Sequence, residues 1–407
     1  MRVLFISFYF PPYSVSTPVT RAVEIIKHLR TFGIEPFVLS QEGFVFGKKD
    51  RSFEPDTKDI PVYRVKMPKF EKKYDRKTPL SGIIKNITWP DNMVLFAMKG
   101  LPLALRIIRE HHIDLVFTFS PPFSSIFLTY LIHKRTHLPY AIDMQDPWKE
   151  DLYDKYKNKI QQSFTYYYER RIFKKAKFIT VINMPMATLY KSEYKLDNVY
   201  FLPFGYRKQD ILIIHEMRKD DRLRFLYAGT LGGTYKNPFP LFKSIDLFFS
   251  KHYGARAEFY FVGNKTPDVL SRLSTFPQDE VVSIPYVEKK DISKLVNNAH
   301  VLMLLSSEGR NSHLVSTSKV YELLNMKRPV AAFLHDGWVY DLVKRYTPFI
   351  TRWDDVVGMA SIFEKLYDLW KDDSLQKYVL MPKEEYAYPY IAQKLYDIIK
   401  KHTQERG

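Results

Sequence analysis

Short apolar runs alternate with amphipathic stretches along most of the chain. Residues 2–7 are largely apolar, as expected for a parallel strand that is buried on both faces. Apolar residues then recur three and four positions apart between residues 19 and 29, which predicts a helix that Gly33 can end. Residues 36–40 form the next apolar run. Strand, helix and strand in this order make a βαβ unit, from which doubly wound parallel sheets are built.

The same alternation continues in two successive sets. The first set adds strands at residues 113–119, 140–143, 178–182 and 199–203 and helices at 101–109, 123–134 and 160–175. The second set has strands at residues 224–229, 257–263, 281–284, 301–305 and 329–333 and helices at 240–249, 292–298, 318–325 and 389–401. Residues 41–78 are rich in lysine, and we expect long loops there around one or two strands.

The length of the chain supports a division into two domains. It has 407 residues, whereas single cores stop growing near ~250–300 residues. The pattern restarts after a junction near residues 204–221. We therefore predict an α/β protein with two Rossmann-like, doubly wound domains, residues 1–205 and 206–385.

Composition excludes several kinds of chemistry. The chain has no cysteine, which excludes disulfides, thiolate metal sites and cysteine nucleophiles. Its eleven histidines show no ligand spacing, so no metal site is predicted. Pro11 and Pro12 interrupt the first apolar run, and no stretch approaches the ~20 apolar residues of a membrane span. We therefore expect a cytoplasmic protein.

The net charge of +17 is concentrated in the first half of the chain. Residues 1–205 carry 32 Lys and Arg against 20 Asp and Glu. Such a surface attracts nucleic acid, anionic lipid headgroups or phosphorylated substrates. No helix-turn-helix, RNP or zinc-finger pattern is present, so nucleic acid is not expected. The basic run at residues 170–177 is either a solvated helix face or a peripheral contact with an anionic membrane.

Six short motifs resemble those of a known family. They are YFPP (9–12), FSPP (119–122), DMQDPW (143–148), YAGTLG (227–232), YFVG (260–263) and SKVYELL (318–324), the last followed by KRPV (327–330). In this order and spacing the chain resembles GT-B glycosyltransferases of the large retaining group often called family 4, especially those that assemble bacterial surface polysaccharides. The resemblance covers nearly the whole chain.

The resemblance implies the architecture and the reaction. A C-terminal helix, at about residues 386–407, is expected to return to the first domain. The expected donor is a nucleotide-diphosphate sugar and the expected acceptor is a glycan or a lipid-linked glycan, with no cofactor and no metal. The enzyme would work in the cytoplasm or at the inner face of the membrane. A nucleotide-sugar 2-epimerase and a non-enzymatic binding protein for sugar nucleotides remain as alternatives.

The first donor-binding element is a glycine loop. Gly229, Thr230, Gly232 and Gly233 follow a predicted strand, and glycines let the backbone approach phosphate oxygens closely. Lys236 aligns with the lysine that similar enzymes place on the donor diphosphate, where it would also stabilise the leaving group. The alternative is an ordinary turn followed by an exposed lysine. Thr230 stands where the family often has an arginine.

The second donor-binding element begins with a helix cap at residues 316–318. The amides that open such a helix suit a diphosphate. The resemblance places Glu322 on the ribose hydroxyls, because a carboxylate accepts two hydrogen bonds; an ordinary surface glutamate is the alternative. The donor-binding residues expected here are Thr317, Ser318, Lys319 and Glu322. Leu314 stands where many relatives have a second glutamate, so the contacts of the sugar stay open.

The first domain is expected to face the acceptor. Ligands of doubly wound sheets lie beyond the carboxyl ends of the strands. This rule places in the cleft Ser16, Thr17 and Arg21 after the first strand and Ser120 at the end of another. No histidine is placed to activate Ser120, so a serine hydrolase is not expected.

Two further residues on this side have competing interpretations. Asp146 either orients and deprotonates the acceptor hydroxyl, as a catalytic residue, or organises its own loop. Trp148 either stacks on a sugar or anchors the same loop. The segment at residues 89–101 is expected to help hold the acceptor.

Overall fold

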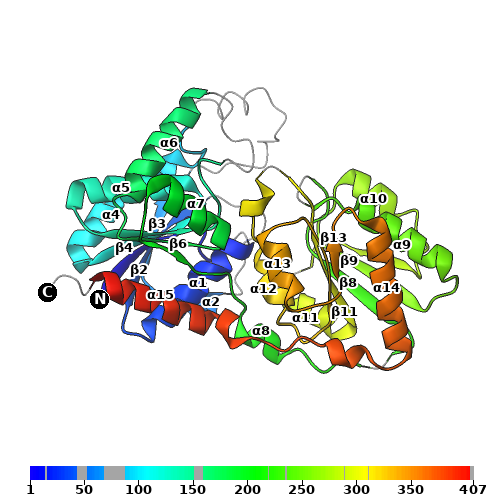
Figure 1. Ribbon diagram of the computed structural model, residues 1–407. Coiled ribbons are helices and arrows are strands. Elements are labelled where there is room, and N and C mark those ends of the chain that lie inside the picture. The colour runs from blue at the N-terminus through cyan, green and yellow to red at the C-terminus, as the bar shows by residue number, and fades with distance from the viewer. Residues whose placement is uncertain are drawn as a thin grey trace. The chain divides into compact units, whose positions relative to one another are not determined.

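The computed structural model describes residues 1–13, 16–43, 53–67, 88–150, 159–218, 220–233, 236–287, 289–309 and 311–403, of which Ser16, Thr17, Lys289 and Lys290 are described for the backbone alone. The chain divides into two compact units (Figure 1). One unit comprises Met1–Phe204 with Tyr388–Gly407, and the other comprises Gly205–Ala387. The boundaries expected from the sequence, after residues 205 and 385, lie within two residues of these.

Seven parallel strands among the described residues form the sheet of the first unit. Their order is β3-β2-β1-β4-β5-β6-β7. Their bounds are β1 (Arg2–Ile6), β2 (Glu35–Glu42), β3 (Val62–Lys66), β4 (Leu115–Ser120), β5 (Tyr140–Met144), β6 (Phe178–Val181) and β7 (Val199–Phe201). The strand order reverses between β1 and β4, and ligands of such sheets lie beyond the carboxyl ends of the strands at this point.

Helices lie on both sides of this sheet (Figure 1). They are α1 (Ser16–Arg30), α2 (Glu54–Thr57), α4 (Val94–His111), α5 (Phe123–Thr136), α6 (Lys159–Phe173), α7 (Met184–Tyr194) and α15 (Tyr388–Thr403). The last of these confirms the expected return of the C-terminal helix. Ile391 and Leu395 of α15 join Val19 and Ile26 of α1 in one buried core. Of the helices described here and below, none is long and apolar enough to cross a bilayer.

The second unit repeats the plan with six parallel strands in the order β10-β9-β8-β11-β12-β13. The strands are β8 (Leu223–Ala228), β9 (Ala257–Val262), β10 (Val281–Ile284), β11 (Val301–Ser306), β12 (Val330–Leu334) and β13 (Ile350–Arg352). The helices are α8 (Lys208–Leu212), α9 (Phe239–Lys251), α10 (Pro267–Leu273), α11 (Lys289–Asn298), α12 (Ser318–Leu323), α13 (Trp338–Lys344) and α14 (Val356–Lys371). Short 3-10 helices occur at η2 (Ser312–Leu314), η3 (Leu375–Tyr378) and η4 (Glu384–Tyr386). Both sheets therefore confirm the expected fold class.

Candidate functional site

Both predicted donor-binding elements leave the second sheet at its switch point. The strand order reverses between β8 and β11. The glycine loop starts at Gly229, directly after β8, and the chain reaches α12 after β11. Since both segments follow carboxyl ends of adjacent strands, they lie at the edge of the sheet where ligands bind.

The glycine loop is tied to the neighbouring strand end. The amide of Gly229 donates to the carbonyl of Val262 at 2.7 Å, and that of Leu231 donates to Asn264 at 2.9 Å. The two strand ends approach so closely that a Cβ at Gly263 would lie 2.5 Å from the carbonyl oxygen of Gly229. Further along, Gly232 has φ +109°, a conformation that favours glycine. The loop therefore has a fixed backbone course that larger residues could not follow.

Lys319 joins the two donor-binding elements. It lies on α12, and its ammonium group reaches across Gly229 to donate to the carbonyl oxygen of Ala228. The same group lies 5.4 Å from the centre of the Tyr227 ring. Tyr227 in turn donates to the carbonyl of Thr230 at 3.0 Å. A cation is thus held at the base of the glycine loop.

The charge around Lys319 is predominantly positive. Burial, together with the nearby charge of Lys236, lowers the pKa of Lys319 to about 8, and the charge of Glu322 opposes the shift. Burial also lowers the pKa of Lys236. Since the charges of Lys236 and Glu322 both act on Lys319, the three residues lie near one another and form one cluster. Among the described residues, no carboxylate forms an ion pair with either lysine, so the cluster suits an anion.

The start of α12 agrees with the expectation, and its end does not. Thr317 is the cap, and its hydroxyl accepts from the amide of Lys319 at 3.4 Å. The helix ends at Leu323, two residues earlier than predicted, and has six residues. Its dipole is therefore small, and the two ammonium groups supply most of the positive charge. Ser318 is buried, so a contact with a ligand would have to come from its amide.

Leu314 occupies the position at which many relatives have a glutamate. It lies in η2 and is buried. It therefore belongs to the packing of the unit, and the contacts of the sugar must come from elsewhere. A cavity of about 270 Å³ adjoins the glycine loop and is lined by Gly232, Gly233, Asn237, Asp268, Glu308 and Trp353, among others. This cavity offers polar groups beside the loop that single-sequence reasoning did not identify.

In the first unit, Asp146 lies near two residues that the sequence analysis did not single out. Burial raises the pKa of Tyr9, and the negative charges of Asp91 and Asp146 add to the shift. Asp91 accepts hydrogen bonds from the amides of Ser124 at 3.0 Å and Met93 at 2.9 Å. Tyr9 follows β1 and Asp146 follows β5. Tyr9 stands in the YFPP motif and Asp91 in the segment at 89–101, so both signals were available in the sequence.

Arg21 does not face the cleft, contrary to the expectation. Its guanidinium forms a two-pronged pair with Asp143, with Nε–Oδ2 at 2.8 Å and Nη2–Oδ1 at 2.7 Å, and both side chains are fully buried. It also donates to the carbonyls of Pro203 at 2.6 Å and Leu202 at 3.0 Å. The sequence did not reveal that Asp143 points inward from its strand and needs a buried counter-ion.

The expected positions of Ser120 and Trp148 in the cleft also require correction. Both are fully buried, so neither faces a ligand. Trp148 stacks on Phe123 with ring centres 5.3 Å apart and planes 10° apart, and it anchors its loop. Ser120 is the last residue of β4. The side chains of Ser16 and Thr17 lie outside the described part of the structure, and their roles stay predictions.

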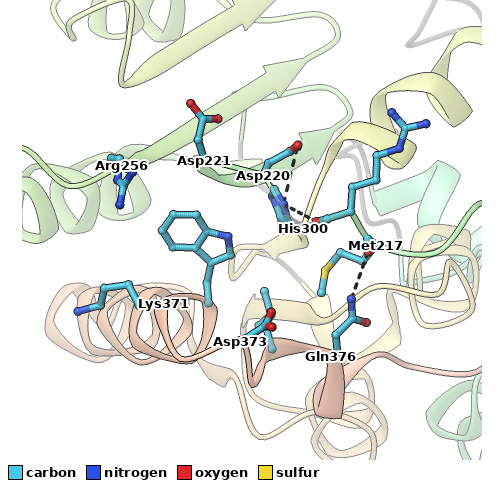
Figure 2. A pocket seen from close by; sticks show the side chains of 11 residues that line it. Met217, Asp220, Asp221, Arg256, His300, Lys371, Asp373 and Gln376 are labelled. Carbon is cyan, nitrogen blue, oxygen red and sulfur yellow. Dashed lines mark hydrogen bonds and ion pairs between the residues drawn. The ribbon is translucent and has the colours of Figure 1, made fainter.

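A second, larger cavity lies elsewhere in the second unit. It measures about 380 Å³, and Asp220, Arg256, His300, Trp370 and Gln376 are among the residues that line it (Figure 2). Asp220, Arg256 and His300 come just before β8, β9 and β11, so the cavity is at the amino edge of the sheet, next to the end of α14. It is therefore not the candidate donor site. Across the described residues, no three His, Asp or Glu side chains gather as a metal site.

No family sequence profile matches the chain, and no curated protein matches it in sequence. Solved structures do match over its whole length. Sucrose-phosphate synthase from Thermosynechococcus elongatus has a TM-score of 0.66 at 11% identity and covers 99% of both chains. Anabaena HepE in complex with UDP-glucose has a TM-score of 0.64 at 12% identity and covers 98% of this chain and 100% of its own.

A third structure carries a different activity in its name. A putative UDP-N-acetylglucosamine 2-epimerase from Listeria monocytogenes has a TM-score of 0.60 at 13% identity and covers 100% of this chain and 97% of its own. At 11% to 13% identity, the similarity shows a shared fold only. Two doubly wound units, a returning C-terminal helix and these full-length matches show that the chain has the GT-B fold of glycosyltransferases and UDP-N-acetylglucosamine 2-epimerases.

Proposed function

We propose that this protein is a glycosyltransferase that moves a sugar from a nucleotide-diphosphate sugar to a hydroxyl of a glycan or lipid-linked acceptor in surface polysaccharide assembly. The observation that carries the proposal is the cluster of Lys236, Lys319 and Glu322 around Gly229. Burying two neighbouring ammonium groups costs free energy, because burial and like charge both disfavour the protonated forms. A diphosphate bound at the cluster would offset this cost. Perturbed lysines at a sheet edge are typical of functional sites.

The cluster supports distinct roles for its members. Lys236 and Lys319 would neutralise the diphosphate as it leaves, which stabilises the transition state without a metal ion. Glu322 would accept hydrogen bonds from two ribose hydroxyls. The loop of Gly229, Thr230, Gly232 and Gly233 would bring backbone amides to the phosphates. Anabaena HepE was solved with UDP-glucose, so UDP-sugars are the first donors to test.

The proposed reaction is a single group transfer with retention of the anomeric configuration, as the resemblance implies. The bond from the anomeric carbon to the diphosphate oxygen breaks, and a bond from that carbon to the acceptor oxygen forms. The acceptor proton passes to the leaving diphosphate. In this proposal Asp146 orients the acceptor hydroxyl.

A nucleotide-sugar 2-epimerase is the second candidate, because the epimerase from Listeria monocytogenes matches the fold over its whole length. An epimerase needs no acceptor, and its product keeps the nucleoside diphosphate attached to the sugar. Incubation of the protein with the donor that it binds, with and without acceptor, separates the two by product analysis. Release of nucleoside diphosphate that depends on acceptor supports transfer, whereas a new epimer without acceptor contradicts it.

Binding is tested first with a thermal-shift panel of UDP-, GDP- and ADP-sugars, because ligands of the folded state raise its midpoint. Calorimetry then compares Glu322→Ala and Lys236→Ala with Lys371→Ala, which removes an exposed lysine of the same unit. Glu322→Ala is expected to weaken binding at least tenfold, or ~1.4 kcal/mol, and Lys236→Ala to slow transfer more than it weakens binding. Unchanged affinity in Glu322→Ala would remove the proposed donor site.

A further inference from the structure

Before Ile172 and Phe173, which are buried, helix α6 exposes apolar side chains and buries polar ones. Ile160, Phe164 and Tyr167 recur four and three positions apart on one face, here called the α6 face, and are 70%, 52% and 55% exposed. The opposite face carries Gln161, Thr165 and Glu169, and all three are buried. An amphipathic helix on a globular protein normally has the reverse arrangement. The apolar face therefore needs an explanation outside the packing of the unit.

Contacts on the buried face prevent the helix from rolling over. The indole nitrogen of Trp89 donates to the hydroxyl of Thr165 at 3.0 Å. That hydroxyl donates to the carbonyl of Gln161 at 2.8 Å. On the exposed side, Arg171 donates to the hydroxyl of Tyr130 on α5 at 2.7 Å, which fixes the end of the helix. The polar face is thus engaged with protein, and the α6 face stays outside.

The α6 face continues into a group of aromatic side chains. Tyr168 lies with its ring centre 6.3 Å from that of Phe164 and 4.8 Å from that of Trp89. Phe127 of α5 lies 5.2 Å from Trp89. Tryptophan and tyrosine concentrate at membrane–water interfaces, where their rings meet both apolar and wet surroundings.

The exposed charges on α6 and just beyond its end have one sign. The exposed charged residues between positions 159 and 175 are Lys159, Arg170, Arg171, Lys174 and Lys175. The acidic residue of this stretch, Glu169, is fully buried, and burial raises its pKa. A second copy of the chain would bring like charges together at this face. An anionic bilayer complements both features, since its surface attracts Lys and Arg and apolar side chains enter the headgroup region.

We propose that the α6 face docks this protein on the surface of an anionic lipid bilayer. Ile160 and Phe164 enter the headgroup region, and the cations at 170–175 contact lipid phosphates. Figure 1 shows α6 at the outside of the first unit, next to α5. The inference rests on α6 alone and does not depend on the proposed transfer reaction. Docking would bring the enzyme to the layer in which a lipid-linked acceptor resides.

The test is cosedimentation of the full chain with vesicles. Wild-type protein is expected to bind vesicles of phosphatidylcholine with phosphatidylglycerol, and binding should fall at least tenfold in Ile160→Ser/Phe164→Ser. The matched control is Leu212→Ser/Tyr253→Ser, which removes two exposed apolar side chains of the second unit (79% and 101% exposed) and should leave binding unchanged. Because all four residues are exposed, the thermal midpoints of both variants should equal that of wild type.

Charge and self-association are tested separately. Lys174→Glu/Lys175→Glu should reduce binding to anionic vesicles and flatten its salt dependence. Equal binding to vesicles of phosphatidylcholine alone would overturn the role of the cations. No binding by wild type, or unchanged binding by Ile160→Ser/Phe164→Ser, would overturn the docking surface. A dimer that the same variant dissociates in sedimentation equilibrium would instead assign the α6 face to a second copy and overturn the proposal.

Discussion

The ammonium group of Lys319 occupies the space that a side chain at position 229 would need. A Cβ on Gly229 would lie 1.8 Å from Nζ of Lys319 and 3.2 Å from its Cε. The φ angle of Gly229 is not among the positive ones, so its backbone conformation does not demand glycine. Glycine is required at position 229 because the ammonium group of Lys319, on α12, lies where a Cβ would be. The glycine loop and α12 are thereby one site.

Gly229→Ala is expected to displace Lys319 and weaken sugar-nucleotide binding about tenfold, ~1.4 kcal/mol. Stability should change little, because the displaced atoms are at the end of a flexible side chain. Calorimetry checks the affinity and thermal denaturation checks the fold. The same substitution in a Lys319→Met background should have almost no further effect, since the two residues act through one contact. Additive effects would contradict this coupling. Gly254→Ala, where a Cβ meets open space but φ is +75°, serves as a control that lowers stability and leaves binding unchanged.

Binding of a diphosphate should take up a proton near pH 8. The pKa of Lys319 is lowered to about 8 in the free protein, so roughly half of the molecules carry a neutral amine at that pH. A bound diphosphate raises the pKa of Lys319, and the complex is protonated. Calorimetry at pH 8 in buffers of different ionisation enthalpy should therefore show proton uptake, which shrinks at pH 6.5. Lys319→Met should abolish it. Heats independent of the buffer at pH 8 would refute the assignment.

Lys319→Met should stabilise the folded protein while it weakens donor binding. The pKa of Lys319 falls from 10.5 to about 8 on folding, so the charged form opposes folding. This penalty is complete below pH 8 and disappears as pH rises from 8 towards 10.5. Allowing for the lost hydrogen bond to Ala228, we expect a gain of about 1–2 kcal/mol at pH 7. Urea denaturation should show the gain at pH 7 and less of it at pH 9.5. A variant less stable than wild type at pH 7 would contradict the reasoning.

How well the sequence predicted each strand depends on where that strand lies in its sheet. Central strands such as β1 and β4 are buried on both faces, and their continuous apolar runs identify them. The edge strands β3 and β13 are largely half-buried or exposed, and their sequences VYRVK and ITR carry no such signal. Helices α7, α10, α13 and α14 were likewise not predicted. Helix α14 did carry a signal, since Met359, Phe363 and Leu366 recur three and four positions apart and are buried in the core.

The residues of the candidate site could be predicted where a motif fixes the backbone. They were harder to predict where the role of a residue depends on the direction in which its side chain points. The order of the glycine loop and the SKVYELL segment indicated Gly229, Lys319 and Glu322. Nothing in one sequence shows that Lys319 crosses Gly229, or that Arg21 turns inward to a buried carboxylate. The inverted polarity of α6 was equally hidden, because the buried face is determined by Trp89 and other distant neighbours.

Arg21→Met should unfold the protein more readily rather than impair ligand contacts. It leaves the carboxylate of Asp143 buried without its counter-ion, and breaking such a pair costs about 3–5 kcal/mol. Urea denaturation measures the loss. Arg2→Met breaks the exposed pair with Glu35 in the same unit and should cost less than ~1 kcal/mol. Donor affinity of the folded fraction should stay at the wild-type level. A loss of affinity without a loss of stability would restore Arg21 to the binding site.

His300 should make stability depend on pH in the acid range. Its Nδ1 accepts from the amide of Arg224 at 3.0 Å, and its Nε2 donates to the carbonyl of Arg218 at 3.1 Å. The neutral ring satisfies both bonds, whereas a second ring proton would face the amide proton of Arg224. Burial lowers the pKa of His300, and the nearby charge of Asp220 only partly opposes the shift.

The lowered pKa of His300 determines the direction in which stability changes with pH. The unfolded chain binds the proton more readily, so the contribution of His300 to stability is present above pH 6.5 and falls as pH drops towards the folded pKa. Urea denaturation from pH 5 to pH 7.5 should show the advantage of wild type over His300→Asn shrinking as the pH falls. The exposed His313→Asn is the control and should leave the pH dependence unchanged. A difference between wild type and His300→Asn that stays constant with pH would mean that His300 is not held neutral, and that its two hydrogen bonds stabilise the protein equally well in the charged form.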